Sequence, residues 1–173
     1  METFKIIRDE DLGQTIAAPV QYRERRASRV IIFDQERNIG LLNVAKKHYH
    51  KLPGGGIEEG ETIIAALRRE TMEELGCQVN NVEDLGMIEE YRGKFGLHRV
   101  SYCFIGNVDG EKKPPHLEQG EIDDGFEPVW LGLDQAIEIL ESESDVSDYE
   151  GKFIRMRDLM FLKEARKYLY EKK

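Results

Sequence analysis

Long apolar runs and cysteine are both scarce in this sequence. No run approaches the roughly 18 consecutive apolar residues that identify a transmembrane helix. The acidic N-terminus, METFKIIRDEDLG, also lacks the apolar core of a signal peptide. The two cysteines, Cys77 and Cys103, lie far apart and form no disulfide framework or zinc-binding pattern. These absences favour a cytoplasmic protein without a membrane partner.

Positive charge is also in deficit, with 25 Lys and Arg against 34 Asp and Glu and a net charge of −9. Such a surface repels nucleic acid, so we expect no stable nucleic-acid binding. A small polyanion can still bind where metal ions supply positive charge locally. The 173 residues are 40% hydrophobic, which predicts a single domain over residues 1–173. Residues 1–27 are its N-terminal extension and a candidate dimerising arm, so a homodimer is a candidate state.

Hydrophobic periodicity predicts a chain in which strands and helices alternate. Strands are expected at 4–7, 30–33, 39–44, 85–92, 97–108 and 127–132. Helices are expected at 62–75, 134–142 and 156–171. The polar segment 109–126 is expected to be a long loop, and the acidic segment 141–151 a solvated connector. Strands before, between and after one central helix indicate a mixed sheet with helices on both faces.

A carboxylate cluster is predicted on the central helix. Glu70, Glu73 and Glu74 stand at i, i+3 and i+4, so they emerge from one helix face. Fixed carboxylates can hold a divalent cation, and an oxygen-only ligand set suits Mg²⁺ or Mn²⁺ better than zinc. Crowding three carboxylates also raises the proton affinity of at least one of them when metal is absent. This makes Glu70 a candidate general base for a metal-bound water.

The segment Gly55–Cys77 resembles the conserved box of the Nudix hydrolases. Their pattern is G-x5-E-x7-R-E-U-x-E-E-x-G-U, in which U is a bulky aliphatic residue. The seven fixed positions are matched here by Gly55, Glu61, Arg69, Glu70, Glu73, Glu74 and Gly76. The two U positions hold Thr71 and Cys77 instead. Thr71 lies on the apolar stripe of the helix, where its hydroxyl can bond back to the backbone, and a buried Cys77 behaves as a small hydrophobe.

The resemblance implies a fold and a set of roles. The fold is of the α/β class, a Nudix-like α/β/α sandwich with a mixed β-sheet and the catalytic loop and helix at residues 54–76. Glu61 and Arg69 are implied as a pair that ties the loop to the helix. The implied metal ligands are Glu70, Glu73, Glu74 and the Gly54 carbonyl, with Glu58 contributing to an additional metal ion.

Residues outside the box supply further candidates. The family often places an additional acid or base on a distant loop, and Glu121 is our choice among the acids of segment 109–126. The others are Glu118, Asp123 and Asp124. The general base is therefore open between Glu70 and Glu121.

Two groups of basic residues are candidates to contact substrate phosphates. The first is Arg23, Arg25, Arg26 and Arg29, and the second is Lys46, Lys47, His48 and His50. Tyr91 and Trp130 are candidates to stack on a nucleobase.

The function implied is metal-dependent hydrolysis of a diphosphate bond in a nucleoside diphosphate derivative. By elimination among substrate classes, we favour a nucleoside triphosphate pyrophosphohydrolase, with oxidised nucleotides among its candidate substrates. A dinucleoside polyphosphate hydrolase and a nucleotide-sugar hydrolase are alternatives within the enzyme class. A non-catalytic nucleotide sensor is another alternative, although the box retains every glutamate. Pyrophosphohydrolysis at RNA 5′ ends would favour a more basic surface than a net charge of −9 provides.

Overall fold

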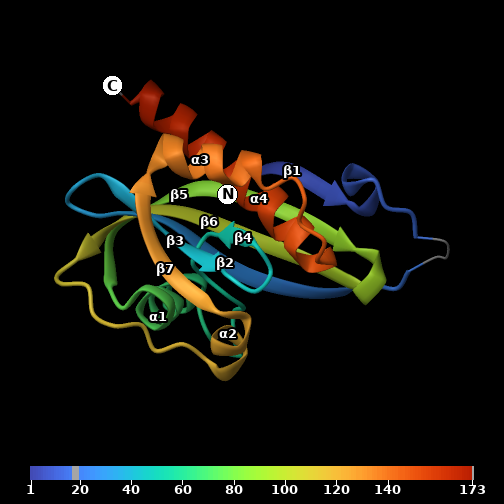
Figure 1. Cartoon of the computed structure of the whole chain (residues 1–173), viewed down its shortest axis with the longest axis horizontal. Coiled ribbons are helices and arrows are strands. Elements are labelled where there is room, and N and C mark those ends of the chain that lie inside the picture. The colour runs from blue at the N-terminus through green and yellow to red at the C-terminus, as the bar shows by residue number, and fades with distance from the viewer. Residues whose placement is uncertain (17–19, 173) are drawn as a thin grey trace.

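A seven-stranded sheet with helices on both faces forms the protein in the computed structural model, which describes residues 1–16 and 20–172 (Figure 1). The strands are β1 Thr3–Arg8, β2 Arg23–Phe33, β3 Asn38–Val44, β4 Tyr49–Lys51, β5 Gln78–Arg92, β6 Leu97–Asp109 and β7 Phe126–Gly132. The α-helices are α1 Ile63–Leu75, α2 Gln119–Asp124, α3 Leu133–Ser142 and α4 Tyr149–Glu171. Two short 3₁₀ turns, η1 Asp9–Leu12 and η2 Gly93–Phe95, complete the described elements. Residues 17–19 of the expected N-terminal extension lie outside the described part.

The sheet is mixed, as the order of elements predicted. Its strand order is β1-β5-β6-β2-β3-β4, and β7 pairs with β3. The β1/β5 and β2/β6 pairs are parallel, whereas β5/β6, β2/β3, β3/β4 and β3/β7 are antiparallel. Residues 3–8 of the expected N-terminal extension therefore form an edge strand of the sheet.

Alternating side chains of β2 build the two layers of the core. Val30 and Ile32 pack in a cluster with Leu67 of α1. Ile31 and Phe33 point to the opposite face and pack in a cluster with residues of α3 and α4. Figure 1 shows α1 on one side of the sheet and α3 and α4 on the other. The predicted α/β/α sandwich is confirmed.

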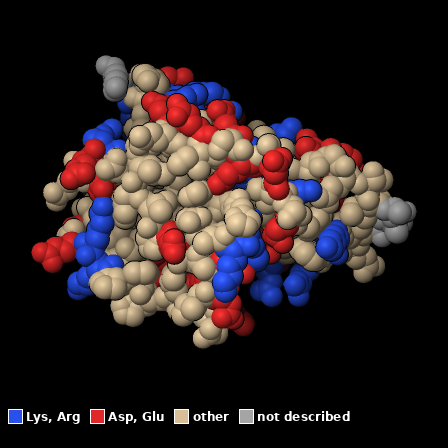
Figure 2. All heavy atoms as spheres, in the orientation of Figure 1, with Lys and Arg blue, Asp and Glu red and all other residues tan. Residues whose placement is uncertain are grey.

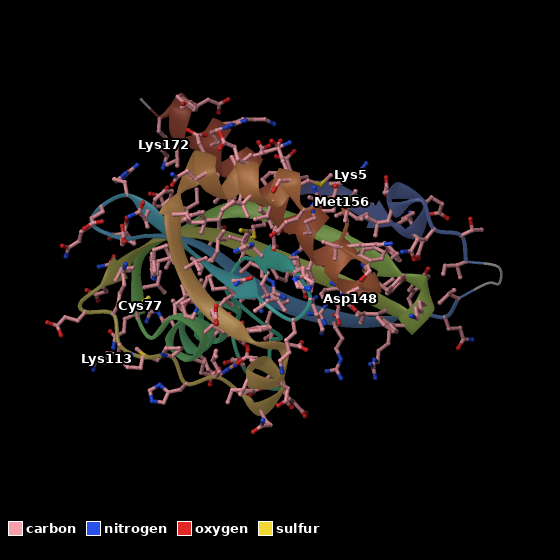
Figure 3. All side chains as sticks on the ribbon, in the orientation of Figure 1. Lys5, Cys77, Lys113, Asp148, Met156 and Lys172 are labelled. Carbon is pink, nitrogen blue, oxygen red and sulfur yellow. The ribbon has the colours of Figure 1, made fainter. Side chains whose placement is uncertain are left out.

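Helix α1 begins and ends where the sequence predicted. The Thr62 hydroxyl oxygen accepts a hydrogen bond from the backbone N–H of Ala65 at 3.1 Å, which caps the helix. Gly76 ends it with φ of +67°, and a Cβ there would lie 1.8 Å from the Lys113 carbonyl oxygen. Figure 3 labels Lys113 beside the next residue, Cys77. The Thr71 hydroxyl donates to the Leu67 carbonyl at 2.6 Å, as predicted.

Several boundaries differ from the sequence prediction because tertiary contacts extend weakly patterned segments. Strand β5 begins at Gln78 instead of residue 85, and two bulges interrupt the alternation that would have revealed it. Strand β2 begins at Arg23 because its polar first half pairs with β6. Strand β4 has only three residues, too few for a periodic pattern. Helix α2 lies within the segment expected to be a loop, where Glu118 and Glu121 cap each other.

The acidic segment 141–151 is not simply a solvated connector, so that expectation was wrong. Val146 within it is buried at 5% exposure. Helix α4 begins at Tyr149, not at residue 156, because the Asp148 carboxylate accepts the Gly151 N–H at 2.7 Å (Figure 3). A capping residue inside an acidic run is hard to recognise from composition.

Charged side chains of both signs are intermixed on the face shown in Figure 2. Among residues 1–16 and 20–172, no helix combines the length and the hydropathy required to cross a membrane.

Candidate active site

The glycine loop lies between strand β2 and helix α1. The Ser28 N–H donates to the Gly55 carbonyl at 3.0 Å, which fixes the loop along β2. Gly54 has φ of +126°, and a Cβ there would lie 2.1 Å from the Ser28 carbonyl oxygen. A Cβ at Gly55 would lie 2.3 Å from Glu70 Oε1. Only glycine at these positions lets the backbone approach both the strand and the carboxylates of α1.

The predicted bridge between Glu61 and Arg69 is present. Arg69 Nε and NH2 donate to the two Glu61 carboxylate oxygens at 3.0 and 3.1 Å. NH2 also donates to the Gly56 carbonyl at 3.0 Å, so one guanidinium holds both ends of the loop. The hydrogen bonds from Arg69 lower the pKa of Glu61. The remaining NH1 group donates to Glu70 at 2.7 Å and to Glu73 at 3.1 Å.

Two carboxylates of α1 meet a third, from a distant part of the chain, beside this loop. One ligand oxygen each from Glu70, Glu74 and Glu121 lies within 4.8 Å of the others. Glu70 and Glu74 are 9% and 1% exposed on α1, and the half-buried Glu121 arrives on α2. Among the downstream acids, Asp124 instead pairs with Lys47 at 2.6 Å, and Asp123 accepts from Gln119 at 2.8 Å. Glu121 was the acid selected from the sequence.

Glu74 is held by two donors. Lys51 Nζ donates to its Oε1 at 2.7 Å, and the Gly54 N–H donates to its Oε2 at 2.5 Å. Lys51 was not among the residues predicted from the sequence. It ends the basic run that precedes the glycines, and this position was its one signal in the sequence. Two other residues of this run were predicted to contact substrate phosphates. In the structure Lys47 pairs with Asp124, and His50 pairs with Glu143.

Three predicted metal ligands lie outside the triad of Glu70, Glu74 and Glu121. The Glu73 side chain is 34% exposed and bonded to Arg69. Glu58 is exposed, and its backbone N–H donates to Glu61 at 3.0 Å. Gly54 contacts the triad through its N–H. Metal binding by Glu73, by Glu58 and by the Gly54 carbonyl stays a prediction.

Burial raises the proton affinity of the two triad carboxylates on α1, Glu70 and Glu74. Burial, followed by the charge of Glu74, raises the pKa of Glu70 against the opposing effect of Arg69. Burial likewise raises the pKa of Glu74, although Lys51 opposes it. The sequence predicted this direction from crowding alone. The larger physical cause is the loss of water around the two carboxylates.

The triad fits a small divalent cation. Octahedral Mg²⁺ with oxygen ligands at about 2.1 Å places adjacent ligand atoms about 3.0 Å apart and opposite ones about 4.2 Å apart. The three oxygens lie within 4.8 Å of one another, so side-chain shifts of about 1 Å would close the site. The donors are all carboxylate oxygens, which Mg²⁺ and Mn²⁺ prefer.

Other residues selected from the sequence have different surroundings. Arg23, Arg25 and Arg26 are exposed, whereas Arg29 is buried at 4% exposure. The Tyr91 ring stacks on His98 with centroids 4.3 Å apart, and the guanidinium of Arg8 lies 4.3 Å from its centroid. The Trp130 ring lies 3.5 Å from Lys112 Nζ. Both aromatic rings are thus in contact with side chains of this chain.

The fold agrees with the comparison to known proteins. The sequence model of the NUDIX domain matches residues 23–155, and the chain belongs to this family. A MutT protein of Bacillus halodurans aligns with a TM-score of 0.54 at 25% identity, covering 66% of this chain and 72% of that one. A MutT NUDIX hydrolase of Burkholderia pseudomallei aligns with a TM-score of 0.53 at 24% identity, covering 65% and 85%. The Nudix resemblance and the predicted fold class are confirmed.

Three curated relatives carry functional names. Nudix hydrolase 13, mitochondrial, of Arabidopsis thaliana is 29% identical over 138 residues, covering 77% of this chain and 67% of that protein. An RNA pyrophosphohydrolase of Sulfurovum is 56% identical over 64 residues, covering 37% and 34%. An oxidized purine nucleoside triphosphate hydrolase of Danio rerio is 32% identical over 83 residues, covering 47% and 48%. The last two alignments span less than half of each relative.

Proposed function

We propose that this protein is a Mg²⁺-dependent pyrophosphohydrolase that cleaves a diphosphate bond in a nucleotide. The meeting of Glu70, Glu74 and Glu121 beside the glycine loop carries this proposal. These carboxylates would hold the metal, and Mn²⁺ could replace Mg²⁺ there. When bound, the metal would supply charge neutralisation for the phosphates and acidify a water molecule.

The other steps of the proposed reaction are assigned to side chains of this site. Glu61 and Arg69 keep the loop against the helix, so that Gly54 and the carboxylates stay in register. A carboxylate oxygen of Glu70 or of Glu121 would accept the proton of the attacking water. Burial raises the pKa of Glu70, which suits a base that must hold a proton briefly. Both residues line the same cluster, so the choice between them is open.

A nucleoside triphosphate, including its oxidised purine forms, is the substrate we favour. The similarity to the Danio rerio oxidized purine nucleoside triphosphate hydrolase supports this choice. Dinucleoside polyphosphates and nucleotide sugars are the alternatives. Triphosphorylated RNA is a second candidate, favoured by the 56% identity with the Sulfurovum RNA pyrophosphohydrolase over 64 residues. The net charge of −9 opposes it, because an acidic surface repels a long polyanion.

A substrate panel tests the proposal. The protein is incubated with Mg²⁺ and each candidate, and released phosphate, pyrophosphate and monophosphate are measured. We expect pyrophosphate from a nucleoside triphosphate, loss of turnover on metal chelation, and loss in Glu74→Gln. Glu83→Gln is the control, because Glu83 is an exposed glutamate paired with Lys172. Nucleotide binding without turnover on any panel member would instead identify the non-catalytic sensor.

Two further properties concern the compartment and the oligomeric state. A reducing compartment, the cytoplasm, is consistent with the free cysteines Cys77 and Cys103, both buried. The Arabidopsis relative is named as mitochondrial, so imaging of a tagged chain is the test. A homodimer formed through the N-terminal segment would appear in light scattering and would dissociate on replacing the exposed Ile6 with lysine, which leaves the buried Ile7 in place.

A further inference from the structure

Arg29 is a buried guanidinium with unused hydrogen-bond donors. It lies on β2 where the strand passes from exposed residues at its start to buried residues, and it is 4% exposed. Its Nε and NH1 groups are fully buried and have no hydrogen-bond partner among the described residues. A buried charged donor left without a partner is costly, and native structures rarely tolerate one without a reason.

The backbone places Arg29 next to the carboxylate triad. A Cβ at Gly54 would lie 3.0 Å from the Arg29 Cα, and the Gly54 N–H donates to Glu74 at 2.5 Å. Glu70 and Glu74 also act electrostatically on Arg29, together with the buried pair Arg157 and Asp158. Burial and the neighbouring Arg157 lower the pKa of Arg29, so its own surroundings do not fully balance its charge.

Lys51 is a second cation at the same place. Its side chain is 10% exposed, and Nζ lies 2.7 Å from Glu74 Oε1 and 4.5 Å from the centroid of Phe126. The Lys51 ammonium therefore forms an ion pair with Glu74, a carboxylate that we assign as a metal ligand. Once a divalent cation takes a share of Glu74, the ammonium is left beside it with less of its counter-charge.

The balance of charge then favours an anion. Three cations already face the triad carboxylates: Arg69 bonds to Glu70, Lys51 bonds to Glu74, and Arg29 is buried nearby. A divalent cation added to this set leaves the site with an excess of positive charge. An incoming oxyanion would neutralise this charge and supply acceptors for the unfilled N–H groups of Arg29.

We propose that Arg29 and Lys51 form an oxyanion subsite that binds a phosphate group of the substrate beside the triad. This inference rests on the proposed function, because a phosphate is the anion that such a substrate brings. Arg29 would supply the directional donors, and Lys51 a compact charge that moves from Glu74 towards the phosphate. The role of Arg29 is binding; neither residue transfers a proton.

Binding of inorganic pyrophosphate in the presence of Mg²⁺ is the test, measured by calorimetry on the whole chain. We expect Arg29→Gln to weaken this binding about tenfold or more, while the Mg²⁺ affinity without pyrophosphate changes less than about twofold. Lys51→Met should weaken pyrophosphate binding and strengthen Mg²⁺ binding, because a competing cation is removed. Arg166→Gln, which removes an exposed arginine from α4, should match the wild type in both measurements.

The outcomes separate this inference from the function itself. Pyrophosphate binding is measured without turnover, so a wild type that hydrolyses no nucleotide leaves the subsite testable. If Arg29→Gln binds pyrophosphate as tightly as the wild type, Arg29 is only a counter-charge for its buried neighbours and the inference fails. If Arg29→Gln does not fold, Arg29→Lys replaces it: the charge is kept and the fork of donors is lost. A subsite predicts weaker pyrophosphate binding by Arg29→Lys, and unchanged binding contradicts it.

Discussion

Replacing the buried Glu90 with glutamine is expected to destabilise the fold by about 3 kcal/mol. Glu90 is 0% exposed on β5 and lies between two arginines that are also 0% exposed. Arg92 NH2 donates to its Oε1 at 2.9 Å, and Arg157 NH1 to its Oε2 at 3.2 Å. Arg157 Nε also donates to Asp158 at 2.7 Å, and Asp158 accepts the Leu52 N–H at 2.8 Å. The network thus joins the sheet, α4 and the loop before Gly54.

The magnitude follows from the pKa of Glu90. Burial alone would raise this pKa, but the charges of Arg157 and Arg92 outweigh it and lower the pKa to about 2 from an ordinary value of 4.5. At about 1.4 kcal/mol per unit, the ionised carboxylate contributes about 3 kcal/mol to folding. For a domain of this size, that loss lowers Tm by about 6 to 12 °C.

The sign of the pH dependence gives a second readout. Because folding lowers the pKa of Glu90, the contribution of its ionised carboxylate to the free energy of unfolding is fully present above pH 4.5. This contribution is lost as pH falls towards about 2. Thermal and urea unfolding of wild type and Glu90→Gln should therefore differ most near neutral pH and converge below pH 4.5. The control, Glu83→Gln, removes an exposed pair with Lys172 and should leave the Tm close to that of the wild type. Equal Tm values for wild type and Glu90→Gln at pH 7 would refute this reasoning.

Three other substitutions test the loop and helix that hold the carboxylates. Thr62→Ala should cost about 1 kcal/mol in urea unfolding, because it removes the N-terminal cap of α1; an unchanged midpoint would contradict that. Gly76→Ala should lower Tm by several degrees or more, since its Cβ would lie 1.8 Å from the Lys113 carbonyl oxygen. Arg69→Lys should lower turnover by at least about tenfold with little change in Tm, because lysine cannot make the two-pronged bond to Glu61. Wild-type turnover in this variant would show that the bridge does not position the site.

The parts of the site that the sequence predicted are those encoded locally. The ends of α1 depend on Thr62 and Gly76, and its buried face on a 3.6-residue repeat. The bridge between Glu61 and Arg69 spans eight positions at the start of the same helix. Glu121 is farther away, and it was selected because the family resemblance implies an additional acid or base on a distant loop; its contact with the triad required the fold.

The parts that the sequence did not predict depend on long-range packing. Asp158 bonds to Leu52 across 106 positions, and α4 showed only an ordinary apolar stripe that concealed this buried carboxylate. Lys51 was overlooked among several basic neighbours because only the fold directs its ammonium to Glu74. Arg29 could not be separated from the exposed Arg25 by composition, although the structure buries only Arg29. A charged residue carries no local signal of its burial.

The most direct test of the central claim is the Mg²⁺ dependence of pyrophosphate release from an oxidised purine nucleoside triphosphate. Wild type, Glu74→Gln, Glu121→Gln and the control Glu83→Gln are compared as Mg²⁺ is titrated. If the triad holds the metal, both triad variants should require more Mg²⁺, and their turnover at saturation should fall by about a hundredfold or more. The control should match the wild type. Wild-type Mg²⁺ dependence and turnover in both triad variants would contradict the assignment of Glu70, Glu74 and Glu121 as the metal site.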